Sequence, residues 1–240
     1  MPFLLIHEDR EYLLSPGETL ETDLGVLEVP EDASPGETVE THLGTRFTVR
    51  KLRLPDLFHH LERTGAPMMP RDVGLVLGLT GVAAGDRVLD AGTGTGILSI
   101  AMARAGAEVV TYEVDEAFAD VARENMATAG VADSVDVRTG DVTDNLDGHD
   151  PFDVMTLDTA DAPAVVKRSP NLLTSGGFVA VYSPFVEDSR DVVETARDVG
   201  LIDVDTRETI QREMDFDDRG SRPSTGGVGH TGYLTIARRP

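Results

Sequence analysis

The sequence predicts an α/β fold preceded by a small β-rich region. The main sign is residues 87–104, where a short apolar strand ending at Asp90 runs through a tight turn into an apolar helix. The turn contains three glycines, Gly92, Gly94 and Gly96. Glycines let the backbone take positive φ values and let a ligand come close. A second apolar strand, 108–112, ends at Glu113, a carboxylate placed to bind the two hydroxyls of a ribose. This order of elements predicts the nucleoside-binding half of an α/β sheet.

The spacing of these glycines distinguishes between cofactors. The dinucleotide-binding pattern G-x-G-x-x-G would need a glycine at position 97, where this chain has Ile97. The observed pattern G-x-G-x-G, preceded by Asp90, resembles motif I of the class I, Rossmann-like methyltransferases that use S-adenosylmethionine (SAM). The cationic sulfur and the ammonium group of SAM suit nearby carboxylates. NAD binding and a tight turn without a ligand are the alternatives.

The composition excludes several kinds of site. The chain has 240 residues, 40% of them hydrophobic, which is enough for a substantial core. It has no cysteine, so it forms neither disulfides nor thiolate metal sites. His59 and His60 are adjacent but have no carboxylate at ligand spacing, so we expect a helix surface there and no metal. The sequence shows no signal-peptide pattern and no apolar run of about 18 residues, so we expect a cytoplasmic protein without a membrane anchor.

The charge of the chain is strongly negative. It has 43 acidic and 21 basic residues, a formal net charge of -22, and Lys51 and Lys167 are its only lysines. The acids are spread over all segments, which indicates adaptation to molar salt, as in halophilic archaea, rather than a disordered acidic tail. An acidic protein that binds a basic partner is the alternative. The charge is compatible with an RNA substrate, because counterion release contributes little to nucleic-acid binding at molar salt.

Residues 1–55 are expected to form a small N-terminal β domain. Short apolar runs alternate there with turn clusters that contain Pro-Gly or Leu-Gly. The segment 15–25 recurs as 34–44 with nine of eleven positions identical, which predicts two equivalent hairpin segments of one small barrel. The segment 46–53 is the most basic stretch of the chain, and it is either a solvent-exposed strand face or a contact for RNA.

Residues 56–72 are expected to be a linker, and 73–240 a SAM-dependent methyltransferase domain. Within this domain, the helix 115–129 is expected to bury an apolar stripe that includes Val114 and Phe118.

The end of the chain predicts two further strands, 203–211 and 231–237. A long loop joins them, and a loop of that length in a compact domain is usually functional or mobile. If the two strands pair antiparallel, they match the reversed final strand of class I methyltransferases.

Three aspartates are expected at the carboxyl edge of the sheet, where open α/β folds bind their ligands. Asp141 and Val142 follow the third strand, and this acid either accepts a hydrogen bond from an adenine amine or is a simple turn residue. Asp158 ends the fourth strand, and Asp161 follows it in an irregular loop. We expect the chemistry at these two acids, with a structural cap of the next helix as the alternative for Asp158.

Several motifs together indicate a family. Besides motif I they are Arg63-Thr64 through Pro70-Arg71-Asp72, Leu79-Thr80-Gly81, Tyr182-Ser-Pro184, and Arg222-Pro223 followed by His230-Thr-Gly-Tyr-Leu-Thr-Ile-Ala-Arg238. With the N-terminal β domain, they give the sequence a resemblance over nearly its full length to the archaeal and bacterial tRNA (adenine-58-N1) methyltransferases. The C-terminal motif, Arg222-Pro223 followed by 230–238, is the part of this resemblance that is most specific to the family.

The resemblance implies SAM as methyl donor and N1 of adenine 58 in the T-loop of tRNA as acceptor. It also implies a homotetramer and, in archaeal members, methylation of the preceding adenine. By this resemblance Asp158 is the catalytic residue, with Asp161 as the second candidate. The implied cofactor-binding residues are Met68, Asp90, Gly92, Thr93, Gly94, Thr95, Gly96, Glu113, Asp141, Val142 and Asp158. The implied substrate-binding residues are Tyr182, Arg222 and His230.

The chain departs from the family after Asp158. The family motif Asp-Leu-Pro-x-Pro-Trp here reads Asp-Thr-Ala-Asp-Ala-Pro, and a family glutamine is replaced near Gly65 or Ala66. These differences concern the packing of the acceptor base more than the cofactor. A methyltransferase of this fold that acts on a protein or a corrinoid precursor, and a catalytically silent RNA-binding subunit, are the competing hypotheses.

Overall fold

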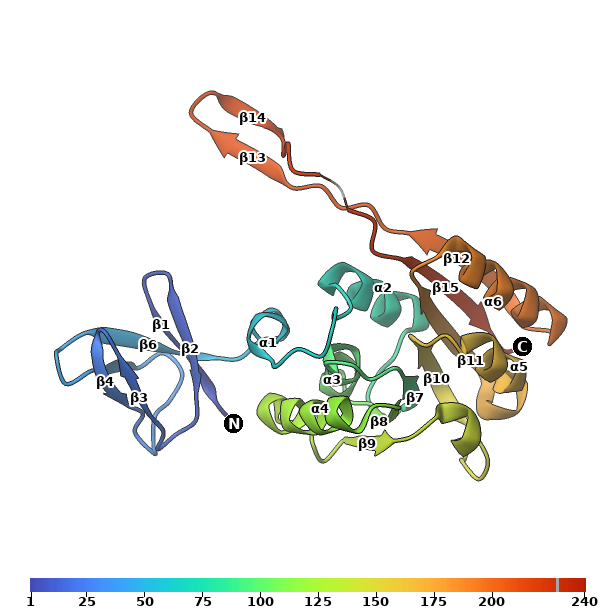
Figure 1. The fold of residues 1–240 in the computed structure, drawn as a ribbon, viewed down its shortest axis with the longest axis horizontal. Helices are drawn as coiled ribbons and strands as arrows, with labels where there is room; N and C mark the ends of the chain where they lie inside the picture. The colour runs from blue at the N-terminus through green and yellow to red at the C-terminus, as the bar shows by residue number, and fades with distance from the viewer. Residues whose placement is uncertain (228) are drawn as a thin grey trace.

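The computed structural model describes residues 1–227 and 229–240. It consists of an N-terminal β region, a seven-stranded sheet covered by helices, and a hairpin that projects from the body (Figure 1). The N-terminal strands are β1 (Phe3–His7), β2 (Arg10–Leu14), β3 (Thr19–Thr22), β4 (Gly25–Glu28), β5 (Thr38–Glu40) and β6 (Arg46–Lys51). No helix in these described ranges is long and apolar enough to span a membrane.

The N-terminal strands form two sheets rather than the one small barrel that we expected. An antiparallel sheet has the order β2-β1-β6-β5, and β3 pairs only with β4. Their core contains the buried side chains of Leu5, Leu27, Phe47 and Val49. The alternation along β6 buries its apolar residues and leaves its basic residues exposed.

The internal repeat adopts the same local structure twice. In the first copy Glu18 accepts a hydrogen bond from the amide of Ser15, and in the second Glu37 accepts one from the amide of Ser34. The glycine amide of each copy also bonds to a valine carbonyl, of Val29 and Val49 respectively, at 2.8 Å. The equivalence of the two segments is therefore confirmed.

The seven-stranded sheet has the order β12-β15-β11-β10-β7-β8-β9. Its strands are β7 (Arg87–Ala91), β8 (Glu108–Glu113), β9 (Val135–Thr139), β10 (Phe152–Leu157), β11 (Leu173–Ser183), β12 (Ile202–Glu208) and β15 (Tyr233–Arg238). Neighbouring strands from β9 to β11 are parallel, whereas β15 pairs antiparallel with both β11 and β12. The expected reversed final strand is therefore confirmed.

Helices cover both faces of this sheet. They are α1 (Leu54–His60), α2 (Pro70–Thr80), α3 (Ile97–Arg104), α4 (Glu116–Ala129), α5 (Ala162–Leu172) and α6 (Val186–Asp198), with a 3-10 helix η1 (Val142–Asn145). Because strand side chains alternate between faces, Val88 packs with α2, α3 and α4, whereas Leu89 packs with α5 and α6. Leu57 of α1 is buried in the same core as α3, so this part of the expected linker contacts the main body.

The long loop before β15 contains a β-hairpin that the sequence analysis did not predict. Strands β13 (Met214–Asp217) and β14 (Gly220–Pro223) pair only with each other and project from the body in Figure 1. Their residues are mostly exposed, and only Met214 and Phe216 are large and apolar, so the apolar alternation is too short to indicate a strand.

Candidate active site

The site lies where β7 and β10, neighbours in the sheet, reach its carboxyl edge. The amide of Asp158 donates to the carbonyl of Ala91 at 2.8 Å, which brings the two following loops together. Gly92 has a φ of 86°, and a Cβ placed on it would lie 2.1 Å from the carbonyl oxygen of Asp158. Glycine is required at this position because the backbone of Asp158 occupies the place of a side chain.

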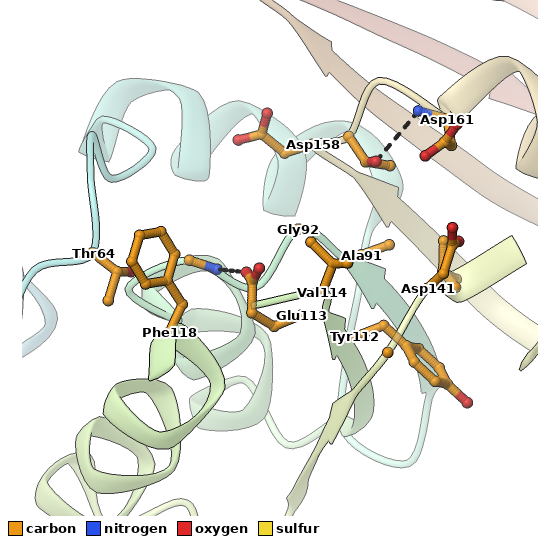
Figure 2. A pocket seen from close by; sticks show the side chains of 14 residues that line it. Thr64, Ala91, Gly92, Tyr112, Glu113, Val114, Phe118, Asp141, Asp158 and Asp161 are labelled. Atoms are coloured by element: carbon orange, nitrogen blue, oxygen red, sulfur yellow. Dashed lines mark hydrogen bonds between the residues drawn. The ribbon is translucent and has the colours of Figure 1, made fainter. Parts of the chain in front are cut away.

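Gly94 has a different role in the same turn. A Cβ placed on it would meet no atom nearer than the Thr64 hydroxyl at 3.9 Å, so the space above this residue is open. Its amide donates to Oε2 of Glu113 at 2.9 Å, as Figure 2 shows. The amide of Asp115 donates to Oε1 of the same carboxylate at 3.2 Å. A carboxylate has about four acceptor positions, so Glu113 can still accept from two hydroxyl groups.

A cavity of about 310 Å³ opens over this turn, bounded by Glu113 and by Asp141 after β9 (Figure 2). Its lining residues are Thr64, Ala91, Gly92, Gly94, Tyr112, Glu113, Val114, Phe118, Gly140, Asp141, Val142, Asp158, Thr159 and Asp161. Oδ1 of Asp141 accepts from the amide and the hydroxyl of Thr143, both at 2.7 Å, which lowers the pKa of Asp141. Asp141 is thus a turn residue, and it also borders the cavity.

Three residues of this cavity were missed or misinterpreted at the sequence level. Val114 and Phe118 are 75% and 40% exposed, so the expectation that both belong to the buried stripe of α4 is wrong. The stripe consists of Ala119, Ala122 and residues further along, which leaves Phe118 at the cavity rim. The hydroxyl of Thr64 is buried and has no hydrogen-bond partner among the described residues. A buried unpaired hydroxyl costs free energy, so this oxygen is suited to a ligand atom.

A smaller cavity of about 40 Å³ lies on the other side of the glycine turn. It is bordered by Met68 and by the turn residues Gly92 to Gly96. Asp90, at its base, is buried and accepts hydrogen bonds from the hydroxyls of Ser99, Thr111 and Thr156. Burial raises the pKa of Asp90, and these three donors oppose the rise. The carboxyl group of Asp90 is therefore held by three protein hydroxyls beneath the glycine turn.

The two threonines of the turn, Thr93 and Thr95, are also buried and border this cavity. The hydroxyl of Thr93 bonds to that of Thr111 at 2.6 Å. The hydroxyl of Thr95 accepts from the amide of Thr64 at 3.3 Å, which ties the segment before α2 to the turn.

A third cavity, of about 330 Å³, lies beyond Asp158, between the loop 158–163 and the start of α6. Two aromatic residues line it, Tyr182 at the end of β11 and Phe185 just before α6. Phe185 is 66% exposed although it is large and apolar. Pro163 and Pro184 add further apolar surface to the lining of this cavity.

Asp158 borders all three cavities. Its side chain reaches solvent through them, while surrounding protein removes much of the water that would solvate its charge. This desolvation, together with the negative charge of Asp90, raises the pKa of Asp158 to about 6. Strongly perturbed carboxyl groups in clefts are typical of functional sites.

The other expected site residues are placed differently. Asp161 borders the first cavity but neither of the others, at the opposite end of the loop from Asp158 (Figure 2). His230 bonds to Oε1 of Glu208 at 2.8 Å and to the carbonyl of Pro184 at 3.0 Å, and these two acceptors raise its pKa. It therefore supports the wall of the third cavity. Arg222 lies in β14 on the projecting hairpin, apart from the three cavities.

Strand β6 and the residues just after it expose basic side chains. Arg46 pairs with Glu40, but Arg50, Lys51 and Arg53 are exposed and form no ion pair in the described ranges. Among all residues that the structure describes, no three or more metal-ligating side chains form a cluster.

Comparisons with known proteins agree with this geometry. A family model described as the tRNA methyltransferase complex GCD14 subunit matches residues 58–219. The tRNA (adenine(57)-N(1)/adenine(58)-N(1))-methyltransferase TrmI of Methanocaldococcus jannaschii is 31% identical over 268 aligned residues, which cover 99% of this chain and 94% of that relative. The chain belongs to this tRNA methyltransferase family. The resemblance inferred from the motifs is thereby confirmed.

Solved structures confirm the class I fold. A SAM-dependent O-methyltransferase from Thermotoga maritima superposes with a TM-score of 0.81 at 26% identity, covering 99% of this chain and 92% of that one. The tRNA (m1A58) methyltransferase TrmI of Aquifex aeolicus gives a TM-score of 0.76 at 21% identity, covering 100% and 97%. Both matches span the N-terminal β region as well as the large sheet.

Proposed function

We propose that this protein transfers a methyl group from SAM to N1 of adenine 58 in the T-loop of tRNA. The observation that carries the proposal is the position of Asp158, which borders the two cavities of the glycine turn and a third, aromatic-lined cavity on its other side. A methyl donor in the first two cavities and an acceptor base in the third would both lie beside the carboxylate of Asp158.

The residues around the first two cavities fit SAM. Glu113 would accept the two ribose hydroxyls, and Asp141 would accept from the adenine amine. Phe118 would cover the adenine ring, and the unpartnered hydroxyl of Thr64 supplies a further polar contact. Met68 and the turn 92–96 would enclose the amino-acid end, whose ammonium is attracted by the nearby carboxylates. When bound, SAM supplies an electrophilic methyl group.

The third cavity would hold the acceptor base. The lone pair of adenine N1 lies in the ring plane and is normally used in base pairing, so the nucleotide must be extruded before it can react. Tyr182 and Phe185 provide aromatic surfaces for the extruded base. Asp158 would accept a hydrogen bond from the exocyclic amine, which directs the neighbouring N1 toward the methyl group.

The same carboxylate also suits the charge change of the reaction. The N1 lone pair forms the new bond to carbon, and the adenine thereby becomes cationic. An ionised Asp158 beside the ring stabilises this developing positive charge, and the partly dehydrated site strengthens the interaction. Asp161 is the second candidate for this part, although it borders only the first cavity.

The projecting hairpin supports assembly of several copies, which we propose to be a homotetramer. Ile210, Met214 and Phe216 are exposed along this segment, Phe216 to 77%. An isolated two-stranded hairpin is only marginally stable in water, so apolar side chains on it favour packing against another copy. Size-exclusion chromatography with light scattering should give four chains per particle, and replacing 210–225 by a Gly-Ser linker should give smaller particles.

The RNA would contact basic residues outside the cavities. We assign this part to Arg222 on the hairpin and to Arg50 and Lys51 on β6, all of which are exposed. His230 would act indirectly, by supporting the cavity wall at Pro184. The surrounding negative charge of the protein fits a function at molar salt, where it is screened.

Methyl transfer to unmodified tRNA tests the proposal. The protein is incubated in molar KCl with labelled SAM and a tRNA transcript, and the modified position is mapped by the stop of reverse transcription. We expect a stop at adenine 58. A second stop at 57 would match the activity in the printed name of the Methanocaldococcus relative. Intact SAM binding without methylation of tRNA would contradict the proposal and favour a silent RNA-binding subunit.

A further inference from the structure

Asn125 is a buried polar side chain on the core face of α4. It is 3% exposed, and the other buried residues of this helix are Ala119, Ala122, Met126 and Ala129. Asparagine inside a helix is less favourable than alanine, and burial of an amide costs free energy unless the amide is hydrogen-bonded. The hydrogen bonds of Asn125 therefore decide what this residue contributes.

The side chain of Asn125 joins two segments that are distant in the sequence. Its Nδ2 donates to the carbonyl of Glu62 at 2.8 Å and to the carbonyl of Thr95 at 2.9 Å. Its Oδ1 accepts from the amide of Glu62 at 3.2 Å. A side-chain amide has two donor hydrogens and one acceptor oxygen, so both hydrogens and the oxygen are used. Asn125 therefore fixes the segment before α2 against the glycine turn.

The same segment is bonded to the glycine turn a second time, at Thr64. The amide of Thr64 donates to the hydroxyl of Thr95 at 3.3 Å. Because positions 62 and 64 are both hydrogen-bonded, the backbone between them has little freedom. The hydroxyl of Thr64 is held 3.9 Å from the place where a Cβ of Gly94 would stand, and it is the only atom within 4 Å of that place outside the turn.

The hydroxyl of Thr64 is the one polar group of this connection that the fold does not use. Its oxygen is buried and has no hydrogen-bond partner among the described residues, which costs free energy. Valine has the same shape and would fill the position without this cost. The open space over Gly94 belongs to the first cavity, which Thr64 borders together with Glu113. The unused hydroxyl is therefore available to a ligand that Glu113 also binds.

We propose that Asn125 is a positioning residue for SAM, because it holds the segment 62–64 where the hydroxyl of Thr64 can bond to the cofactor. This inference rests on the proposed function, which places SAM over the glycine turn. Asn125 borders none of the three cavities, so it acts through this segment. Thr95 completes the connection, because its carbonyl accepts from Asn125 and its hydroxyl accepts from the amide of Thr64.

Calorimetric titration of SAM into the full-length protein, without tRNA and in molar KCl, tests the inference. Thr64→Val keeps the shape of the side chain and removes the hydroxyl. Loss of one hydrogen bond corresponds to about a fivefold to tenfold rise in Kd, which we expect for this variant. Asn125→Leu has a similar shape and should raise Kd by about the same factor. In a Thr64→Val background, Asn125→Leu should raise Kd by less than about twofold, because the hydroxyl that it positions is already absent.

Three further variants separate positioning from folding. Thr64→Ser retains the hydroxyl, so we expect it to keep the wild-type Kd. Thr235→Val removes a buried hydroxyl that is bonded to Thr206 on strands β15 and β12, at the other side of the sheet from the glycine turn, and should also keep the wild-type Kd. Melting curves show which variants are folded. Thr95→Val removes only the acceptor of the Thr64 amide, and it replaces Asn125→Leu in the cycle if that variant does not fold.

Two results would overturn the inference. An unchanged Kd in Thr64→Val would exclude the contact between its hydroxyl and SAM. An equal rise of Kd from Asn125→Leu in the wild-type and Thr64→Val backgrounds, or a lower melting temperature with unchanged Kd, would leave Asn125 with a purely structural role. These titrations contain no tRNA, so their outcome is independent of methylation at adenine 58, whose absence would contradict the proposed function itself.

Discussion

The pH dependence of methyl transfer should report the ionisation of Asp158. Burial and the nearby charge of Asp90 raise the pKa of this carboxyl group to about 6. The ionised form accepts a stronger hydrogen bond from the exocyclic amine, and only this form stabilises a cationic base through its negative charge. The value of kcat/KM for tRNA should therefore rise with pH and level off above this pKa, since kcat/KM reports the ionisation of the free enzyme.

The size of the effect follows from the pKa. With a pKa of about 6, about 9% of the carboxyl groups are ionised at pH 5 and about 97% at pH 7.5. The rate constant should then differ by about tenfold between these two pH values. An aspartate with the ordinary value of 3.8 would be mostly ionised at both, and kcat/KM would change little.

Initial rates of methyl transfer measured from pH 5 to pH 8 at constant molar KCl give the profile. Asp158→Asn keeps the shape of the side chain but cannot ionise, so we expect kcat to fall by about 100-fold and the pH dependence to disappear. Asp198→Asn, at an exposed position at the end of α6, is the matched control and should keep the wild-type midpoint. A midpoint below about pH 4.5 would refute the electrostatic reasoning. Loss of the pH dependence in Asp161→Asn instead would assign the catalytic role to Asp161.

Three further predictions follow from the same structure. Asp158→Asn should raise the melting temperature at pH 7.5 but not at pH 4. The raised pKa means that the native state binds more protons than the unfolded state between about pH 4 and 6, so native stability falls as pH rises through this window. Glu113→Gln should weaken SAM binding about tenfold by calorimetry, because the amide has one acceptor oxygen where the carboxylate has two. Phe185→Ala should raise KM for tRNA about fivefold to tenfold through lost stacking and leave SAM binding unchanged, while Phe185→Tyr should restore KM. Unchanged KM in Phe185→Ala would place the acceptor base elsewhere.

Most elements of the large sheet could be predicted from the sequence, because each depends on residues close together in the chain. The strand that ends near Asp90 and the strand that ends at Glu113 lie where their apolar runs indicated. The acids at the strand ends were also found correctly, because parallel strands deliver such residues to one edge of the sheet. The roles of these acids toward SAM and tRNA stay predictions.

What the sequence missed has a common physical cause. Phe118 fits the apolar period of α4, but only the packing of this helix on the sheet decides that it faces the cavity and not the core. Gly92 has the positive φ that the turn predicts and lines two cavities, but the sequence did not show that the backbone of Asp158 is what excludes a side chain there. In both cases the deciding neighbour is distant in sequence or belongs to another element.

The sequence alone determined the order of the elements, the glycine turn and the acids at the strand ends, because hydrophobic period and turn chemistry act over a few residues. Only the tertiary structure decided that three cavities meet at Asp158 and that the hydroxyl of Thr231 accepts a hydrogen bond from Arg71. Those contacts depend on how the sheet brings its strand ends together. No local pattern records which distant side chains will meet there.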